Sequence, residues 1–258
     1  MPPAQPFAVV DATHWPYPRW IAHRGAGRLA PENTLAAFRA GHAHGYRMFE
    51  CDVRLSADGV PFLLHDDVLD RTTDGRGEAA ALAWDELSVL DAGAWHSAKF
   101  RGERLLSLQA LVRFCQIEDC ALNVELKPAP GTEYETGRIV ARMLEREWGG
   151  RLPPLLSSFR VEALRGACAG GPSLPRALLI GSPFPDCLRL AKEQACIALV
   201  AGHEHVSPSF VQQVRAEGLA LLSYTVNDEA EARRLLQLGL HGLITDCVNC
   251  FDPGRQAA

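Results

Sequence analysis

Short apolar runs alternate with longer amphipathic segments along most of the chain. The runs are rich in branched and aromatic side chains, which is typical of β-strands. The segments between them carry apolar residues three and four positions apart, which is the period of an α-helix. The pattern predicts strands at Trp20–His23, Met48–Leu55, Ala121–Lys127, Leu155–Ser158, Arg176–Ile180, Cys196–Ala201, Ala220–Tyr224 and Gly242–Thr245.

Helices are expected between these strands. Ser107 has the character of a helix start, and Thr132 and Glu135 have the spacing of a capping box. Asn33 and Asn227 are candidate caps for the first and last helices. The helices are predicted at Pro31–Gly45, Ser107–Cys115, Thr132–Leu144, Val161–Cys168, Pro185–Gln194, Ser207–Glu217 and Asp228–Leu238.

Strands that alternate with helices form parallel sheets, and eight such units in 258 residues match a closed (β/α)₈ TIM barrel of the α/β class. We therefore expect a single domain over residues 1–258, although length alone would also permit two smaller ones. The proline-rich residues 1–19 are expected to form an extended arm on the barrel floor. The connection over residues 66–102 is far longer than usual and is expected to be an insertion that forms a lid or a pocket wall.

The strand Met48–Leu55 carries charge where a barrel strand should be apolar. Successive side chains point to opposite faces of a strand, so Glu50 and Asp52 lie on the same face. Two carboxylates side by side in a desolvated place repel each other and lose their hydration. A cation must offset that cost, and a bound metal ion is the simplest candidate.

Polar side chains also mark the ends of the first and third predicted strands. His23 lies at the first end, and Glu125 and Lys127 lie at the third. Because active sites of such barrels lie at the carboxyl ends of the strands, these groups can converge. With Glu125, the carboxylates offer three hard oxygen ligands suited to Mg²⁺ or Ca²⁺. The alternative is a buried ion-pair network with Arg24, Arg54 and Lys127, which is costly unless it is fully paired.

A phosphate ester could be cleaved by such a set of groups. His23 and His65 are the side chains here whose usual pKa suits proton transfer near neutral pH, so one could act as general base and the other as general acid. Arg24 and Lys127 could donate hydrogen bonds to the non-bridging phosphate oxygens. The residues by themselves indicate only that a phosphate ester is the substrate.

Composition limits the other classes of function. The net charge of −5 gives no basic surface for nucleic acid or an anionic membrane. The N-terminal residues lack a basic stretch followed by a continuous apolar one, and no apolar run reaches the roughly 20 residues of a membrane span. Eight scattered cysteines fit reduced thiols. We therefore expect a cytoplasmic protein with a small-molecule substrate and no integral membrane association.

The motifs in the first half resemble the glycerophosphodiester phosphodiesterase family, particularly its short soluble bacterial members. The resemblance rests on His23-Arg24-Gly25, Pro31-Glu32-Asn33-Thr34, Glu50-Cys51-Asp52-Val53, Asp58-Gly59, His65-Asp66, Arg71-Thr72-Thr73 and Asn123-Val124-Glu125-Leu126-Lys127. Weaker echoes occur at Tyr224–Asn227 and Thr245-Asp246. The resemblance implies a TIM barrel with a small insertion, a metal held by Glu50, Asp52 and Glu125, and acid–base chemistry by the two histidines.

The resemblance also implies the substrate class. We expect hydrolysis of diesters such as glycerophosphocholine or glycerophosphoethanolamine to sn-glycerol 3-phosphate and an alcohol, with one divalent cation, Mg²⁺ or Ca²⁺. A related barrel phosphodiesterase acting on lysophospholipids or inositol lipids is one alternative. A non-catalytic protein that binds phosphodiesters is another, although binding alone would not need a pair of proton-transfer groups.

Three further features are open to two interpretations. Many family members carry tryptophan where this chain has Tyr224, which is expected to contact the substrate alcohol. His203 and His205 could form a second metal site or could simply be polar residues at the rim. Cys247 and Cys250 have the spacing of a redox or zinc half-site, but no second pair accompanies them, which favours chance.

Overall fold

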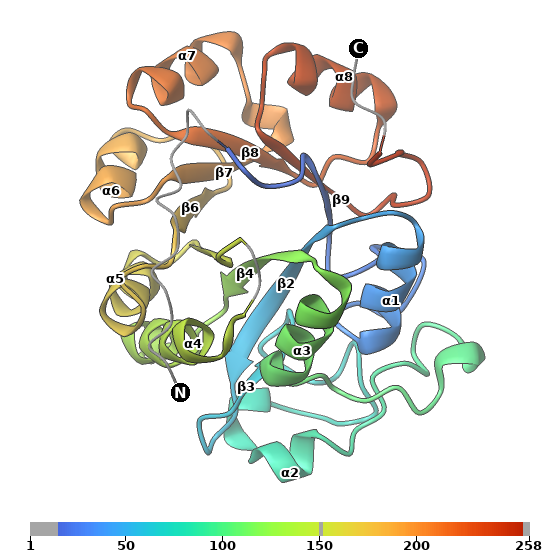
Figure 1. The fold of residues 1–258 in the computed structure, drawn as a ribbon. Coiled ribbons are helices and arrows are strands. Elements are labelled where there is room, and N and C mark those ends of the chain that lie inside the picture. Colours follow the sequence, from blue (N-terminus) through green and yellow to red (C-terminus); the bar gives the residue numbers. More distant parts are fainter. Residues whose placement is uncertain (1–14, 150–151, 255–258) are drawn as a thin grey trace.

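A computed structural model describes residues 15–149 and 152–254, whose strands form a closed ring (Figure 1). The strands of the ring run parallel to one another, and they are β1 (Trp20–Ala22), β2 (Met48–Leu55), β4 (Ala121–Leu126), β5 (Leu155–Ser158), β6 (Arg176–Ile180), β7 (Ala198–Gly202), β8 (Ala220–Tyr224) and β9 (Gly242–Thr245). β1 closes the ring, because Ala22 pairs with Phe49 of β2 on one side and with Thr245 of β9 on the other. β3 (Pro61–Leu63) is antiparallel to β2 and lies outside the ring order. The predicted (β/α)₈ TIM barrel is confirmed.

Helices surround the strands (Figure 1). They are α1 (Leu35–Ala43), α3 (Leu108–Glu118), α4 (Glu133–Glu147), α5 (Val161–Gly170), α6 (Cys187–Glu193), α7 (Pro208–Ala216) and α8 (Glu229–Gln237). α4 and α5 approach most closely at two glycines, since a Cβ atom on Gly137 would lie 1.9 Å from the carbonyl oxygen of Ala163 and one on Gly166 would lie 1.9 Å from that of Tyr134. None of the helices in the described residues is long and apolar enough to cross a membrane.

The barrel has an outer and an inner apolar core, and the alternation along each strand separates them. On β2, Cys51 and Val53 belong to the outer core beneath the helices, whereas Met48 belongs to the inner one. The inner core also contains Ile21, Leu155, Ala177, Val200, Leu222 and Ile244. Glu50 and Asp52 are buried on the side of Met48. They therefore point into the barrel, above its apolar floor.

The predicted arm is described only from residue 15, and residues 1–14 lie outside the described residues. Tyr17 is buried in the inner core, and its hydroxyl donates a 2.7 Å hydrogen bond to the carbonyl oxygen of Pro153. Trp15 lies beside it, with ring centroids 4.9 Å apart. Because Pro153 lies two residues before β5, this contact lies at the amino end of the barrel.

The long connection after β3 lies outside the barrel, beyond α1 and α3 in Figure 1. It contains three short elements, η1 (Ala79–Ala81), α2 (Trp84–Leu87) and η2 (Ala98–Phe100). It also has an apolar cluster of its own, made of Phe62, Leu64, Leu69, Ala79, Leu87, Ala92 and Leu105. The segment is therefore ordered by its own packing as well as by its contacts with the barrel.

Two predicted helix caps are wrong at the level of single residues. The hydroxyl of Thr34, rather than Asn33, accepts the N–H of Ala37 at the start of α1. The carboxylate of Asp228, rather than the amide of Asn227, accepts the N–H of Glu231 at the start of α8. In both cases the asparagine side chain binds a carboxylate in the active site instead.

The predicted capping box of α4 is also wrong. The N–H of Thr132 closes a turn onto the carbonyl oxygen of Ala129, and its hydroxyl donates to the same oxygen at 2.8 Å. Thr132 is still the N-cap residue of α4, as predicted, but its side chain accepts no backbone N–H, and Glu135 binds Arg138 one turn later on the helix. The strand predicted from Cys196 begins only at Ala198, because the Cys196 N–H still bonds to the end of α6.

Candidate active site

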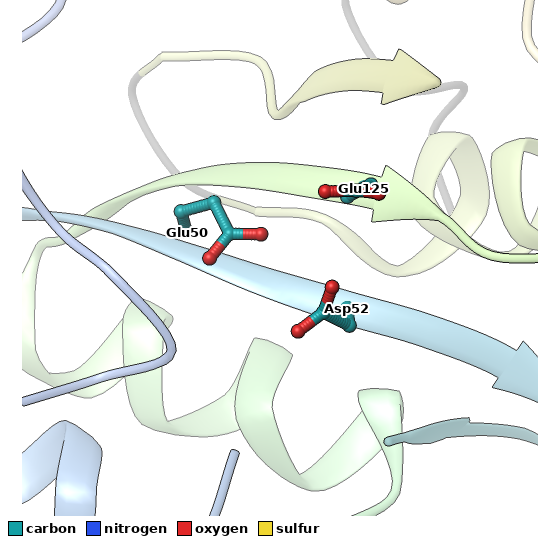
Figure 2. A group of neighbouring side chains, drawn as sticks. All are labelled: Glu50, Asp52 and Glu125. Carbon is teal, nitrogen blue, oxygen red and sulfur yellow. The ribbon is translucent and has the colours of Figure 1, made fainter. Parts of the chain in front are cut away.

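Glu50, Asp52 and Glu125 lie close together on the neighbouring strands β2 and β4 (Figure 2). Asp52 of β2 and Glu125 of β4 are direct partners in the sheet register. One carboxylate oxygen of each of the three residues lies within 4.8 Å of the others. Glu50 Oε1, Asp52 Oδ1 and Glu125 Oε1 are buried and accept no well-aligned hydrogen bond from the described residues, although Lys127 Nζ forms an ion pair with Glu125 Oε1 at 3.3 Å. Such unsatisfied hard oxygens fit a divalent cation.

The cluster is electrostatically unfavourable without a cation. Burial, together with the charge of Asp52, raises the pKa of Glu50 to about 8 and the pKa of Glu125 to about 7. Burial acts in the same direction on Asp52 and is the largest single effect, but the charges of Arg24, His65 and Lys127 and the hydrogen bond from Asn33 together outweigh it and hold the pKa of Asp52 below its usual value. One carboxylate is thus ionised at neutral pH, and its two neighbours resist ionisation.

Asp52 is fixed by groups from three other segments. The Asn33 side-chain amide donates to Asp52 Oδ2 at 2.9 Å, and its oxygen accepts the Asp52 N–H at 3.3 Å. Arg24 Nε lies 3.2 Å from the same Oδ2 atom. Lys127 Nζ lies 3.3 Å from Glu125 Oε1 and 3.9 Å from Asp52 Oδ1. Arg24 and Lys127, which were predicted to bind phosphate, therefore flank the carboxylates from opposite sides.

His23 lies next to Glu50 and is oriented by a carboxylate from the far end of the chain. Its Nδ1 atom is 2.6 Å from Asp246 Oδ1, and its Nε2 atom is 3.7 Å from Glu50 Oε2. Burial lowers the pKa of His23, but the hydrogen bond to Asp246 and the charge of Glu50 outweigh burial and keep the pKa above its usual value. Asn227 holds Asp246 in turn, by accepting its N–H and donating to its Oδ2.

His65 follows the end of β3 by two residues. Its Nδ1 atom is 2.7 Å from Asp66 Oδ1. Asp66 accepts a hydrogen bond from Arg71, which also binds Glu32, and Glu32 accepts another from Arg24. Burial lowers the pKa of His65, although the nearby Asp52 acts to raise it. Both histidines thus have Nδ1 bound to a carboxylate and Nε2 left for a substrate.

The remaining predicted residues lie further from the carboxylates. The Tyr224 hydroxyl donates to the carbonyl oxygen of Ile180 at 3.2 Å, and its ring meets Phe159 edge-on with centroids 6.2 Å apart. His203 Nδ1 is 3.1 Å from Glu231 Oε1, at the rim of the barrel. Cys247 and Cys250 are free thiols.

Several residues that hold the site were not assigned to it from the sequence. Asp246, Asn33 and Asp66 each bind a predicted catalytic or metal-binding side chain. The Thr245-Asp246 motif could have identified Asp246 from the sequence, and the His65-Asp66 pair could have identified Asp66. Asn33 carried a misleading signal, because its position before a helix is also that of a cap.

Two cavities adjoin the cluster. One, of about 500 Å³, lies between His23, Arg24 and the long connection after β3. The other, of about 370 Å³, is lined by Glu125, Lys127 and Phe159. Both cavities therefore reach side chains that the sequence assigns to the site.

Comparisons with known proteins agree with this geometry. A model of the glycerophosphoryl diester phosphodiesterase family matches residues 23–249. A glycerophosphodiester phosphodiesterase of Caldanaerobacter subterraneus subsp. tengcongensis is 30% identical over 230 residues, which cover 88% of this chain and 93% of that protein.

Solved structures give the same answer. An Oleispira antarctica phosphodiesterase in complex with the product sn-glycerol 3-phosphate is 35% identical, with a TM-score of 0.86 over 89% of this chain and 93% of that one. A glycerophosphodiester phosphodiesterase from Agrobacterium tumefaciens is 26% identical, with a TM-score of 0.77 over 91% of this chain and 99% of that one. The chain therefore belongs to the glycerophosphoryl diester phosphodiesterase family of hydrolases.

Proposed function

We propose that this protein hydrolyses soluble glycerophosphodiesters to sn-glycerol 3-phosphate and an alcohol, with one Mg²⁺ or Ca²⁺ ion bound by Glu50, Asp52 and Glu125. The observation that carries the proposal is the set of unsatisfied carboxylate oxygens between two histidines that are each oriented by a carboxylate. The product named for the Oleispira antarctica relative supports the choice of substrate.

The bound ion would supply Lewis-acid stabilisation of the phosphate charge. Arg24 and Lys127 would donate to the non-bridging oxygens, since both cations already lie within 4.0 Å of the metal-binding carboxylates. Tyr224 would contact the substrate, because its ring packs against Phe159, which lines the second cavity. Together with the ion that the carboxylates would hold, Arg24 and Lys127 would neutralise the negative charge that develops on the phosphate oxygens.

His23 and His65 would transfer the protons. One would remove a proton from the attacking group, either water or the 2-hydroxyl of the substrate, and the other would give a proton to the departing alkoxide. The carboxylates at Asp246 and Asp66 fix the tautomer of each ring, so that Nε2 is the atom that faces the phosphate. This arrangement explains why both rings need a negatively charged partner.

Turnover of glycerophosphocholine and glycerophosphoethanolamine tests the proposal. The enzyme should be inactive after treatment with EDTA and active again after Mg²⁺ or Ca²⁺ is added. Glu125→Gln should lower the affinity for the ion, measured by calorimetry, while leaving the circular dichroism spectrum unchanged. Full activity in EDTA, together with no heat of ion binding, would contradict the metal assignment.

A further inference from the structure

The cavity beside His23 is formed jointly by the barrel and by the long connection after β3. His23, Arg24 and Thr225 line it on the barrel side, and Trp95 and His96 line it on the other. Its volume of about 500 Å³ is large enough for a small alcohol. Since His23 lies in its wall, an ester oxygen within reach of His23 would carry its substituent into this cavity.

The charges in the wall of this cavity are paired, with one exception. Arg24 binds Glu32, and His23 binds Asp246. The Arg28 side chain is exposed and has no ion pair or hydrogen bond within residues 15–149 and 152–254. The cavity therefore has one uncompensated positive charge at its wall.

The backbone of Arg28 is held firmly on two sides. Its N–H donates to the carbonyl oxygen of Asp246 at 3.1 Å, and its own carbonyl oxygen lies 3.1 Å from His96 Nε2. The preceding Gly27 has a φ of +53°, and a Cβ atom there would lie 2.1 Å from the Asp246 carbonyl oxygen. The loop therefore holds the backbone of Arg28 at a fixed place beside Asp246, the residue that orients His23.

We propose that this cavity holds the leaving alcohol and that Arg28 makes the enzyme select alcohols by charge. Head groups with carboxylate or hydroxyl oxygens would be favoured, and quaternary ammonium groups would be disfavoured, because Arg28 attracts the former and repels the latter. The inference rests on the proposed function. It concerns only which diester is preferred, and Arg28 contacts none of the metal-binding carboxylates.

Three substrates of similar size isolate the effect of charge. They are the glycerol 3-phosphodiesters of choline, of 3,3-dimethylbutanol, which is its neutral isostere, and of 4-hydroxybutanoate. We expect kcat/KM to fall in the order anionic, neutral, cationic. A unit charge on the head group, roughly 6 Å from Arg28 in a water-like dielectric, changes kcat/KM about threefold. Because Arg28→Glu reverses the charge at this position, it should raise kcat/KM for the choline diester about tenfold relative to that for the neutral isostere.

Arg160→Gln is the matched control for Arg28→Gln. Arg160 is also exposed and without an ion pair in the described part of the chain, but it lines the second cavity. Arg28→Gln should reduce the difference in kcat/KM between the charged and the neutral diesters about threefold, and Arg160→Gln should leave this difference unchanged. The inference would be overturned if Arg28→Glu left the ratio of kcat/KM for the choline diester to that for the neutral isostere unaltered, or if Arg160→Gln changed this ratio as much as Arg28→Gln does. Either result would leave the proposed turnover of glycerophosphodiesters intact. If the wild type cleaves none of the three diesters with metal present, the proposed function itself fails.

Discussion

Replacing Glu50 with glutamine should stabilise the metal-free protein, although it removes a metal-binding residue. The glutamine side chain has nearly the same shape and keeps an oxygen for the Arg24 N–H, which now donates to Glu50 Oε2 at 3.1 Å. It carries no charge, so it is not repelled by Asp52 and loses less hydration free energy on burial. The substitution therefore isolates the electrostatic cost of the carboxylate.

The size of the effect follows from the pKa of Glu50, which burial raises from 4.5 to about 8. Because the folded protein holds this proton more tightly than the unfolded chain, its stability falls as the pH rises from about 4.5 to about 8. Each pH unit in that window costs about 1.4 kcal/mol, which amounts to about 3 kcal/mol at pH 7. For a chain of this length that corresponds to roughly 10 °C in Tm.

Urea denaturation in EDTA at pH 4.5 and at pH 7 measures this effect. The gain from Glu50→Gln should be close to zero at pH 4.5 and about 3 kcal/mol at pH 7. Glu78→Gln, at an exposed carboxylate, is the control and should change little at either pH. With Mg²⁺ present the order should reverse, because only the wild type gains the free energy of ion binding. A gain of equal size at both pH values would show that repulsion at Glu50 is not the cause.

Three further results are expected. Because burial raises the pKa of Glu50 to about 8 and that of Glu125 to about 7, ion binding at pH 7 should release protons from these carboxyl groups. The heat of ion binding should therefore vary among buffers of different ionisation enthalpy. A heat that is the same in every buffer would exclude proton release. His23→Ala and His65→Ala should each lower kcat at least about 10²-fold, and the double variant should lose less than the product of the two. A substrate lacking the glycerol 2-hydroxyl should react much more slowly if that hydroxyl attacks the phosphorus, since internal attack carries an effective molarity of roughly 10⁵ M or more. Equal rates for this analogue and the parent diester would indicate attack by water.

The sequence predicts the carboxylate cluster because its information is local. Glu50 and Asp52 are two positions apart on a strand whose other face is apolar, and Glu125 repeats the pattern on the next parallel strand. Alternation along a strand and the shared polarity of parallel strands are enough to bring these three together.

The residues that orient the cluster could not be predicted in the same way. Asp246 reaches His23 across 223 positions of sequence, and only the closure of the ring between β1 and β9 brings them together. Asn33 reaches Asp52 from a left-handed backbone conformation, with φ of 59°, which no periodic pattern encodes. Helix caps failed for the related reason that Asn33 and Asn227 suit a cap and a carboxylate partner equally well.

Alternating charges connect the two sides of the site through Asp52, Arg24, Glu32, Arg71, Asp66 and His65. This series begins at a fully enclosed carboxylate and passes through Arg71, whose side chain is 44% exposed, before it reaches His65. Dissolved salt weakens attraction between exposed charges over about 8–10 Å at physiological concentrations and affects enclosed charges far less. Ionic strength should therefore loosen the His65 side of the enzyme before the His23 side. A fall in kcat with added NaCl, lost in Arg71→Gln and retained in Asn227→Ala, would identify Arg71 as the point where the surrounding solution acts on catalysis.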